Sequence, residues 1–366
     1  MSDLARRDFR RILLIKPSSA GDLLHALPAL RALRRRFPQA HLAWLVNAPL
    51  AELIAHDPAL DEVIAFDRRR YGRLWRSPAV ATDFARFARD LRRRRFDLVV
   101  DLQGLIRSGL LALFSGAAVR IGFRAAREFG WIGYTHRVRP PVGARHAVDR
   151  NAALIAELGA APTAADLALS PSEAARAAAG DLLADAGVAP DEPFVALAPA
   201  TRWETKNWPA ERFAALAREV HARLGLRSVL IGSPDERPIL DAVHRGAGDA
   251  AVDLAGRTPL TTLPAVIERA RLVVCGDSLP MHLAAALARP LVAIFGPTNP
   301  DWTGPYGRLR DVLRDDVPCS PCRFQRLRDC PAQHVCMSGI DVERVCRAIA
   351  ARLELPATAP CGSRGA

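Results

Sequence analysis

Short apolar runs alternate with longer amphipathic segments along most of the chain. The first run, 11–15, stops at Lys16, passes through a Pro-Ser-Ser-Ala-Gly loop, and resumes after Asp22 with apolar residues at helical spacing. A run of this kind is typical of a strand buried in a parallel sheet, and the spacing that follows predicts a helix. Because open α/β sheets bind ligands at the carboxyl ends of their strands, this loop is the first candidate site.

The same pattern predicts two series of strands. The stretch 158–192, rich in Ala, Pro, Ser and Asp, separates them and holds the expected crossing between two domains. We therefore expect an α/β protein with two Rossmann-like doubly wound domains facing a cleft, at 1–165 and 176–350, and a flexible tail at 351–366. The predicted strands are 11–15, 41–46, 62–66 and 96–101 in the first domain, and 194–197, 228–231, 251–254, 272–275 and 291–295 in the second.

Charge changes the picture of possible partners. The 366 residues carry 51 Lys and Arg against 39 Asp and Glu, a net charge of +12, which favours anionic ligands. The basic residues lie on several loops rather than in one recognition helix or stacking platform, so we do not expect a nucleic-acid partner. No apolar run approaches the roughly 18 residues of a spanning helix, and no signal-peptide core precedes the first strand, so a cytoplasmic protein is expected.

Lysine is rare in this chain. Only Lys16 and Lys206 are Lys among the 51 basic residues, and both follow predicted strands. An ammonium is a compact point charge, unlike the planar guanidinium fork, so these two positions are candidates for a specific role. Chance placement is the alternative.

Three loops of the second domain carry anion-binding chemistry. Gly276–Leu287 is a strand-to-helix turn in which Ser278 is a candidate cap and the free backbone N–H groups make a phosphate site, unless this is an ordinary capped helix. The loop 200–209 supplies a second cluster of polar and cationic groups, or is a solvated surface loop. The loop 296–300 offers Gly296, where backbone can approach a ligand, and the Thr298 hydroxyl. Three such loops on neighbouring strands predict a nucleotide diphosphate site, and none matches a dinucleotide or Walker fingerprint.

Two further features have alternative interpretations. Asp22 is a candidate general base at a loop tip, or simply a helix cap. Four thiols in one segment either hold a structural Zn or Fe ion or remain reduced thiols that pack a loop. These are Cys319, Cys322, Cys330 and Cys336.

Taken in order, these stretches resemble the ADP-heptose lipopolysaccharide heptosyltransferases, inverting glycosyltransferases with the two-lobed GT-B fold. The resemblance covers nearly the whole chain. It is carried by KPSSAGDLLHALPAL, DLQGLIRS, RAARE, RHAVDR, TRWETKNWP, GDSLPMHLAAAL and FGPTNP.

The resemblance implies roles for particular residues. Asp22 corresponds to the general base that deprotonates the acceptor hydroxyl, and Lys206 to the residue that binds the donor phosphates. The implied donor-binding residues are Thr201, Arg202, Lys206, Asp277, Ser278, Leu279, Met281, His282, Gly296 and Thr298. The implied acceptor-binding residues are Ser18, Ser19, Gly21, Arg69, Arg70, Arg73, Gln103, Arg107, Arg127 and His146.

The resemblance also implies partners. The donor is ADP-heptose, and the acceptor is the Kdo or heptose of the inner core on lipid A, met at the cytoplasmic face of the inner membrane by a peripherally associated enzyme that needs no cofactor. The 68–76 and RAARE stretches resemble heptosyltransferase I, which modifies Kdo, whereas the Cys cluster is more familiar from type II members. Leu279 replaces a residue that is usually small in the family. The alternatives are a GT-B transferase or epimerase that uses another nucleotide sugar, and a non-catalytic bilobal binding protein.

Overall fold

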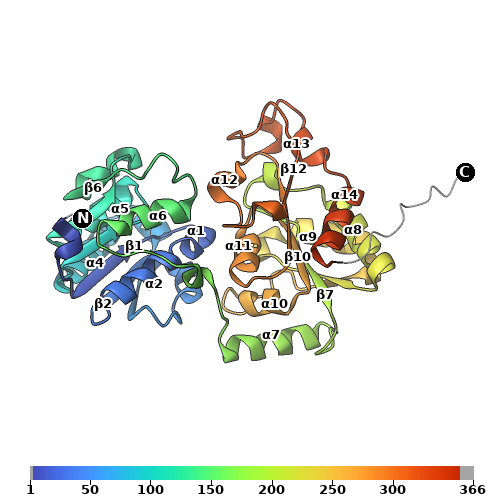
Figure 1. Cartoon of the computed structure of the whole chain (residues 1–366), viewed down its shortest axis with the longest axis horizontal. Coiled ribbons are helices and arrows are strands. Elements are labelled where there is room, and N and C mark those ends of the chain that lie inside the picture. The colour runs from blue at the N-terminus through green and yellow to red at the C-terminus, as the bar shows by residue number, and fades with distance from the viewer. Residues whose placement is uncertain (1–2, 355–366) are drawn as a thin grey trace, which may run out of the picture. The chain divides into compact units, whose positions relative to one another are not determined.

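The structure, a computed structural model, describes residues 3–354, which divide into two compact units between Ala168 and Leu169 (Figure 1). The division falls inside the predicted crossing stretch. Residues 161–168 stay with the N-terminal unit because Arg35 pairs with Asp166, and Arg31 Nη1 donates to the Asp166 carbonyl at 2.8 Å. Leu169 N already donates to Ala286 O of the C-terminal unit, at 2.9 Å.

A six-stranded parallel sheet organises the N-terminal unit. The strand order is β3-β2-β1-β4-β5-β6, so the order reverses between β1 and β4 at the middle of the sheet. That reversal is the switch point at which doubly wound folds bind ligands. The strands are β1 (Arg11–Ile15), β2 (His41–Asn47), β3 (Glu62–Phe66), β4 (Leu98–Asp101), β5 (Val119–Phe123) and β6 (His136–Val138).

Helices connect these strands in the expected alternation. A 3-10 helix, η2 (Ala48–Leu53), follows β2. Four further 3-10 segments of this unit are η1 (Asp3–Arg6), η3 (Leu74–Arg76), η4 (Arg127–Gly133) and η5 (Ala164–Leu167). The α-helices are α1 (Ala20–Leu24), α2 (Leu27–Arg36), α3 (Arg68–Tyr71), α4 (Pro78–Arg93), α5 (Ile106–Phe114) and α6 (Ala147–Ala156).

The C-terminal unit repeats this architecture. Its parallel sheet has the order β12-β11-β10-β7-β8-β9, which reverses between β10 and β7. The strands are β7 (Phe194–Ala198), β8 (Arg227–Leu230), β9 (Ala251–Asp253), β10 (Leu272–Gly276), β11 (Leu291–Phe295) and β12 (Val312–Arg314). The α-helices are α7 (Glu173–Asp185), α8 (Ala210–Leu224), α9 (Arg237–Ala247), α10 (Leu263–Arg269), α11 (Leu279–Ala286), α12 (Pro300–Thr303), α13 (Val335–Ser338) and α14 (Val342–Arg352).

The central strands of each sheet form the cores. All of the side chains from Ile12 to Ile15 are fully buried, and so are those of Leu272 to Cys275 in the other unit. Runs buried on both faces explain why these strands read as continuous apolar segments.

The C-terminal boundary differs from the expectation. The predicted flexible tail, 351–366, overlaps the end of α14, which continues to Arg352. Residues 355–366 lie outside the described part of the chain. Within 3–354, no helix is both long and apolar enough to cross a membrane.

Candidate functional site

The first loop places its polar side chains at the switch point of the N-terminal sheet. β1 ends at Ile15, so Lys16 leads the chain out of the sheet, and α1 begins four residues later at Ala20. Lys16 Nζ donates to Leu102 O, the residue after β4, at 3.2 Å. The lysine therefore spans the two strands between which the strand order reverses.

Asp22 lies in the capping arrangement that the sequence offered as one interpretation. One carboxylate oxygen, Oδ2, accepts from Ser19 N at 2.8 Å and from Ser19 Oγ at 3.0 Å, which is the reciprocal half of a capping box. The other oxygen, Oδ1, lies 3.9 Å from Lys16 Nζ, and the Asp22 side chain is 37% exposed. The cap holds the carboxylate in place while leaving one oxygen accessible to a bound hydroxyl.

Lys16 is a buried ammonium. Burial lowers its pKa, and the neighbouring Asp22 and Asp101 carboxylates oppose that shift. Arg127 and Arg150 add to the lowering, which places both guanidinium groups within electrostatic range of the loop. Two carboxylates and three cationic groups therefore influence one another at the carboxyl ends of β1 and β4.

Asp101 anchors the floor of this region. It is fully buried, accepts from Tyr134 Oη at 2.6 Å, and accepts from the backbone N–H of Gln103 and Gly104 at 2.8 and 3.2 Å. Burial raises the pKa of Asp101, while the hydrogen bonds favour its charged form. These bonds fix the loop that carries Gln103, whose side-chain oxygen Oε1 is buried and has no hydrogen-bond partner among the described residues. This acceptor is available to a donating group, such as a water or a sugar hydroxyl.

A pair of histidines closes the loop on its other side. His25, one turn after Asp22, packs edge-on against His146, with 4.7 Å between ring centroids. His146 caps α6 by accepting from Val148 N at 3.2 Å, and Asn151 Nδ2 donates to His25 O at 3.1 Å. The predicted acceptor residue His146 is therefore next to the Asp22 helix. The sequence analysis did not select His25. Its position three residues after Asp22, on the same face of a predicted helix, could have identified it as a neighbour of Asp22.

The remaining predicted acceptor arginines follow other strands of the same sheet. Arg127 N donates to Gly104 O at 2.9 Å, which ties the segment after β5 to the Gln103 loop. Arg107 lies exposed on the first turn of α5. Arg70 pairs with Asp83 of α4, whereas no ion pair involves Arg69 or Arg73 among the described residues. Since parallel strands end at one edge, these groups share the edge that carries Asp22, with Arg69–Arg73 two strands away from β1.

In the C-terminal unit, the three predicted anion-binding loops follow three adjacent strands, β7, β10 and β11. Their close approach depends on Gly276 at the end of β10: a Cβ there would lie 3.0 Å from Thr201 Cγ2 and 3.1 Å from Lys206 O. The sequence reasoning did not single out Gly276. Its position directly before Asp277, at the end of a predicted strand, could have indicated a close approach of neighbouring loops.

Lys206 and Asp277 form the centre of this cluster. Lys206 Nζ lies 2.7 Å from Asp277 Oδ2, and the same oxygen accepts from Thr298 Oγ1 at 2.8 Å and Thr303 Oγ1 at 3.4 Å. The ammonium also lies 4.5 Å from the centroid of the Trp203 ring. Both side chains are largely buried, 16% and 6% exposed, so their charges are poorly screened. Thr201 orders the loop through two hydrogen bonds. Its N–H donates to Asn207 Oδ1, and its hydroxyl donates to Trp203 O.

The helix after Asp277 differs in part from the expectation. Ser278 is the N-cap residue of α11, but its side chain makes no capping bond, and its Oγ lies 3.5 Å from Gly276 O. The hydroxyl and the first N–H groups of α11 are therefore not paired with each other. Leu279 and Pro280 are partly exposed, and His282 is 9% exposed. Met281 is fully buried, which makes it a core residue with no surface to offer a ligand. Arg202 lies exposed.

Gly296 has a packing role that the sequence did not indicate. A Cβ at this position would lie 2.5 Å from Met337 Sδ and 2.8 Å from Cys336 Sγ. The absence of a Cβ thus lets the chain pack closely against α13. The Thr298 hydroxyl, two residues on, is directed to Asp277.

The Cys-rich segment 319–336 braces two of these loops. His334 Nε2 lies 2.8 Å from Thr205 O, and Thr205 Oγ1 donates to Phe324 O at 2.6 Å, so the segment holds the loop that carries Lys206. Cys322 N donates to Pro297 O at 2.8 Å, which holds the loop after β11. The segment therefore supports the arrangement around Asp277 without contributing to it directly.

The four thiols of this segment are free. Burial raises the pKa of Cys336 to about 11, and the nearby Cys319, Cys322 and Cys330 thiols add to the shift. The thiols are thus within electrostatic range of one another. Within residues 3–354, however, no three His, Cys, Asp or Glu side chains are grouped so as to hold a metal ion.

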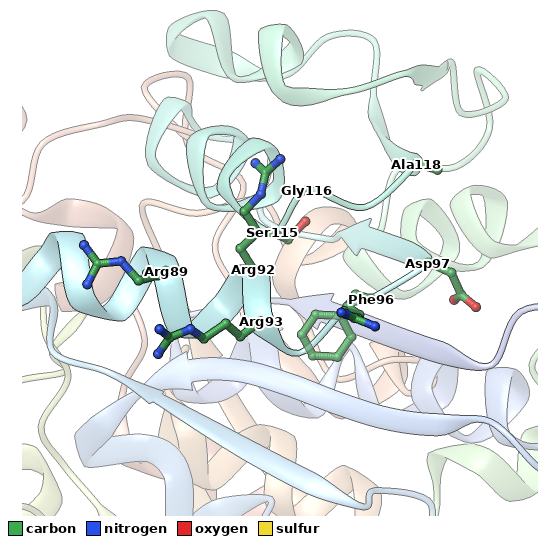
Figure 2. A pocket seen from close by; sticks show the side chains of 9 residues that line it. Arg89, Arg92, Arg93, Phe96, Asp97, Ser115, Gly116 and Ala118 are labelled. Carbon is green, nitrogen blue, oxygen red and sulfur yellow. The ribbon is translucent and has the colours of Figure 1, made fainter.

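A cavity of about 550 Å³ lies in the N-terminal unit, at the opposite edge of the sheet from Asp22. It is lined by the end of α4, the residues before β4 and the turn before β5, at the amino-terminal ends of strands. Arg89, Arg92 and Arg93 contribute to it, but the Arg92 side chain extends away from those of Arg89 and Arg93 (Figure 2). They do not converge on a ligand, so this cavity is not part of the candidate site.

Comparison with known proteins now decides the family. The profile of glycosyltransferase family 9 (heptosyltransferase) matches residues 84–332. Lipopolysaccharide heptosyltransferase 1 of Pseudomonas aeruginosa is 33% identical over 363 residues, covering 95% of this chain and 99% of that protein. The chain belongs to glycosyltransferase family 9.

Solved structures of the family have the same two-sheet architecture. ADP-heptose LPS heptosyltransferase II of E. coli superposes with a TM-score of 0.75 at 26% identity, covering 94% of this chain and 98% of that one. The E. coli heptosyltransferase WaaC with ADP-2-deoxy-2-fluoro heptose gives 0.71 at 26% identity, covering 93% and 98%. This family 9 protein is a glycosyltransferase with the GT-B fold, as the sequence predicted.

Proposed function

We propose that this glycosyltransferase moves heptose from ADP-heptose to the inner core of lipopolysaccharide, with Kdo on lipid A as the acceptor. Relatives named heptosyltransferase 1 are 30–33% identical to the chain, and those named heptosyltransferase 2 are 28% identical. This difference supports the type I reaction, which modifies Kdo, although the thiol cluster resembles type II. We place the reaction at the cytoplasmic face of the inner membrane.

The observation that carries the donor assignment is the Lys206–Asp277 cluster at the switch point of the C-terminal sheet. An ammonium has three N–H donors, and Asp277 occupies one of them. The others are available to the oxygens of a diphosphate, while Asp277, positioned by Thr298 and Thr303, is placed to accept hydroxyls of the sugar. The half-exposed start of α11 adds backbone donors that favour an anion.

The proposed reaction is a direct displacement with inversion. Asp22 Oδ1 takes the proton of the acceptor hydroxyl as the hydroxyl oxygen forms its bond to the anomeric carbon. The bond between that carbon and the diphosphate oxygen breaks, and ADP leaves with the bonding electron pair. Lys206 stabilises the charge that develops on the diphosphate, which is the role of a preorganised electrostatic group. In this mechanism no cofactor takes part.

The N-terminal cluster supplies the acceptor site in this proposal. Kdo carries a carboxylate, and Arg127, Arg150 and the buried Lys16 create a positive potential beside Asp22. Gln103 Oε1 is the acceptor that lacks a partner, so we assign it to a Kdo hydroxyl. His146 packs against His25 at the end of the Asp22 helix, and we assign it to the same acceptor site.

The test is transfer by the purified protein from ADP-heptose to Kdo-lipid A, followed by mass spectrometry of the product and by ADP release. The expected result is one added heptose, with no transfer from UDP- or GDP-sugars. Transfer from another nucleotide sugar would replace the donor assignment. Failure of a folded protein to bind any nucleotide would contradict the proposal and favour a non-catalytic binding protein.

A structural Zn or Fe ion at the four thiols is a separate prediction. The alternative is that reduced thiols pack the segment that braces the Lys206 loop. Metal analysis of protein purified without chelators separates the two: about one ion per chain, lost in Cys319→Ser, supports a metal, and a metal-free protein with full ADP binding supports packing alone.

A further inference from the structure

An apolar surface lies exposed on the N-terminal unit, next to the predicted acceptor arginines. Four large apolar side chains of α5 and η4 are exposed, and we call this set the α5–η4 patch. Its members are Leu110, Leu113, Phe129 and Ile132, which are 36%, 39%, 67% and 52% exposed. Singly exposed apolar residues are common, whereas a contiguous group marks an interaction site.

The four side chains belong to two segments, α5 and η4, that approach each other at their backbones. A Cβ on Gly109 would lie 2.1 Å from Gly130 O, and a Cβ on Gly133 would lie 1.9 Å from Gly109 O. Leu110 directly follows the first of these glycines, and Phe129 and Ile132 directly precede the other two. Leu113 lies one turn further along α5, on the same face as Leu110.

The backbone of η4 is strained where it presents the patch. Glu128 and Phe129 have φ angles of 55° and 60°, in the left-handed region that bulky residues avoid. Such a conformation is disfavoured for residues with a Cβ. The Phe129 ring meets the Trp131 ring edge-on, with 6.4 Å between centroids, yet its side chain stays 67% exposed, so packing within the unit offsets little of that cost. Strain of this kind is retained at functional sites.

Positive charge surrounds the patch. Arg107 lies one turn before Leu110 on the same face of α5, and Arg124 and Arg127 are exposed just before Phe129. The acidic side chain among them is Glu128. The whole unit is basic: residues 1–168 contain 28 Arg and Lys against 16 Asp and Glu, whereas residues 169–366 contain 23 of each. The net charge of +12 therefore resides entirely on the unit that carries the patch.

We propose that the α5–η4 patch docks the N-terminal unit on the surface of an anionic lipid bilayer, with Leu110, Leu113, Phe129 and Ile132 entering the interface. Apolar side chains bordered by arginines are the combination that binds an anionic membrane surface, since burial and attraction to headgroups add. Docking here brings Arg107 and Arg127 to headgroup level, where the sugar of a lipid-anchored acceptor lies. This last consequence rests on the proposed function, whereas the docking itself does not.

The test measures partition of the full chain onto vesicles by cosedimentation, with no donor or acceptor present. The variants are Phe129→Ser and Ile132→Ser, singly and together. The matched control is Leu309→Ser, an aliphatic side chain that is 49% exposed on the neutral unit. Melting temperature and ADP titration of each variant show that it is folded.

On vesicles of phosphatidylglycerol and phosphatidylethanolamine, the double variant should partition at least about tenfold more weakly than wild type, because two large apolar groups no longer leave water. Leu309→Ser should match wild type, and phosphatidylcholine vesicles should bind wild type several-fold more weakly. Unchanged partition of the double variant would overturn the proposal. The proposal would also be overturned if wild type self-associated, the double variant were monomeric, and the two partitioned equally. The patch would then be a protein interface.

A second readout separates docking from catalysis. With a soluble Kdo acceptor that lacks acyl chains, the double variant should turn over as fast as wild type. With Kdo-lipid A in vesicles, its KM should rise about tenfold at unchanged kcat. Loss of turnover with both acceptors would contradict a purely docking role. If the chain proved to use another substrate, the vesicle partition would still test the patch by itself.

Discussion

The two units solve the problem of binding an anion in different ways. The N-terminal unit carries the entire net charge, and several of its predicted acceptor arginines, such as Arg69, Arg73 and Arg107, are exposed and spread over the loops of its sheet. The C-terminal unit is neutral and relies on one largely buried lysine, paired at 2.7 Å with Asp277. Exposed cations attract a partner over a distance but are screened by salt, whereas a buried, prepositioned charge acts locally and with defined geometry. The contrast is consistent with the large membrane acceptor and the small nucleotide-sugar donor that we propose.

The largest effect that would test this contrast is expected at Asp22. Asp22→Asn preserves an acceptor for the Ser19 cap but removes the base, so kcat should fall by about a hundredfold or more. Initial rates of ADP release with saturating Kdo-lipid A measure it. Ser19→Ala is the matched control: it removes only the hydroxyl that donates to Asp22. An Asp22→Asn enzyme with wild-type turnover would assign Asp22 to capping alone.

Lys206 should give the next largest effect, and in the other unit. Lys206→Ala removes a charge-assisted contact to the diphosphate and leaves Asp277 without its cation, so ADP affinity should fall about ten- to a hundredfold. Calorimetric titration with ADP measures this change. Arg202→Ala, a neighbouring exposed cation, should change affinity less, and equal losses in the two variants would indicate a diffuse electrostatic site instead.

The buried lysine of the N-terminal unit should affect turnover and stability together. Lys16→Met removes the ammonium that bonds Leu102 O and approaches Asp22, so kcat should fall by about tenfold with ADP affinity unchanged. Burial lowers the pKa of Lys16 from its usual 10.5, so between its folded pKa and 10.5 the unfolded chain binds more protons. The free energy of unfolding therefore gains a contribution that rises with pH in this window.

Urea denaturation at several pH values checks this sign. Lys16→Met should lack the contribution from Lys16, so its free energy of unfolding relative to that of wild type should fall as pH rises toward 10.5. A constant difference between the two proteins across that window would show that Lys16 is not desolvated in the folded state.

The smallest effect is expected where the thiol segment braces the donor loop. His334→Ala removes the contact to Thr205 O, so ADP affinity should fall a few-fold, at the scale of one hydrogen bond. Titration with ADP measures it, and Ser338→Ala, whose hydroxyl donates only to His334 O, serves as control. A loss as large as that of Lys206→Ala would mean that His334 contacts the donor.

Much of the fold was predictable because central parallel strands are buried on both faces. Such strands read as unbroken apolar runs, and the central strands β1 and β11 were predicted with the bounds that they have, as was the edge strand β3. The edge strands β6 and β12 were missed because each has three residues and includes polar side chains. Nothing in so short a segment distinguishes it from a loop.

The site was predictable at the level of loops, but not of contacts. The loops could be placed because ligands of such sheets gather at strand ends. Contacts between distant segments had no local signal: His25 meets His146, 121 residues away, and Gly296 packs against Met337 of a later helix. The fully buried position of Met281 likewise depends on how α11 packs.

The most direct test of the division between the units is calorimetric titration of Asp22→Asn with ADP, beside a turnover assay of the same preparation. The account predicts that ADP binds with wild-type affinity while heptose transfer is lost, because the base belongs to the acceptor unit and the nucleotide to the other. A loss of ADP affinity as large as the loss of turnover would contradict it.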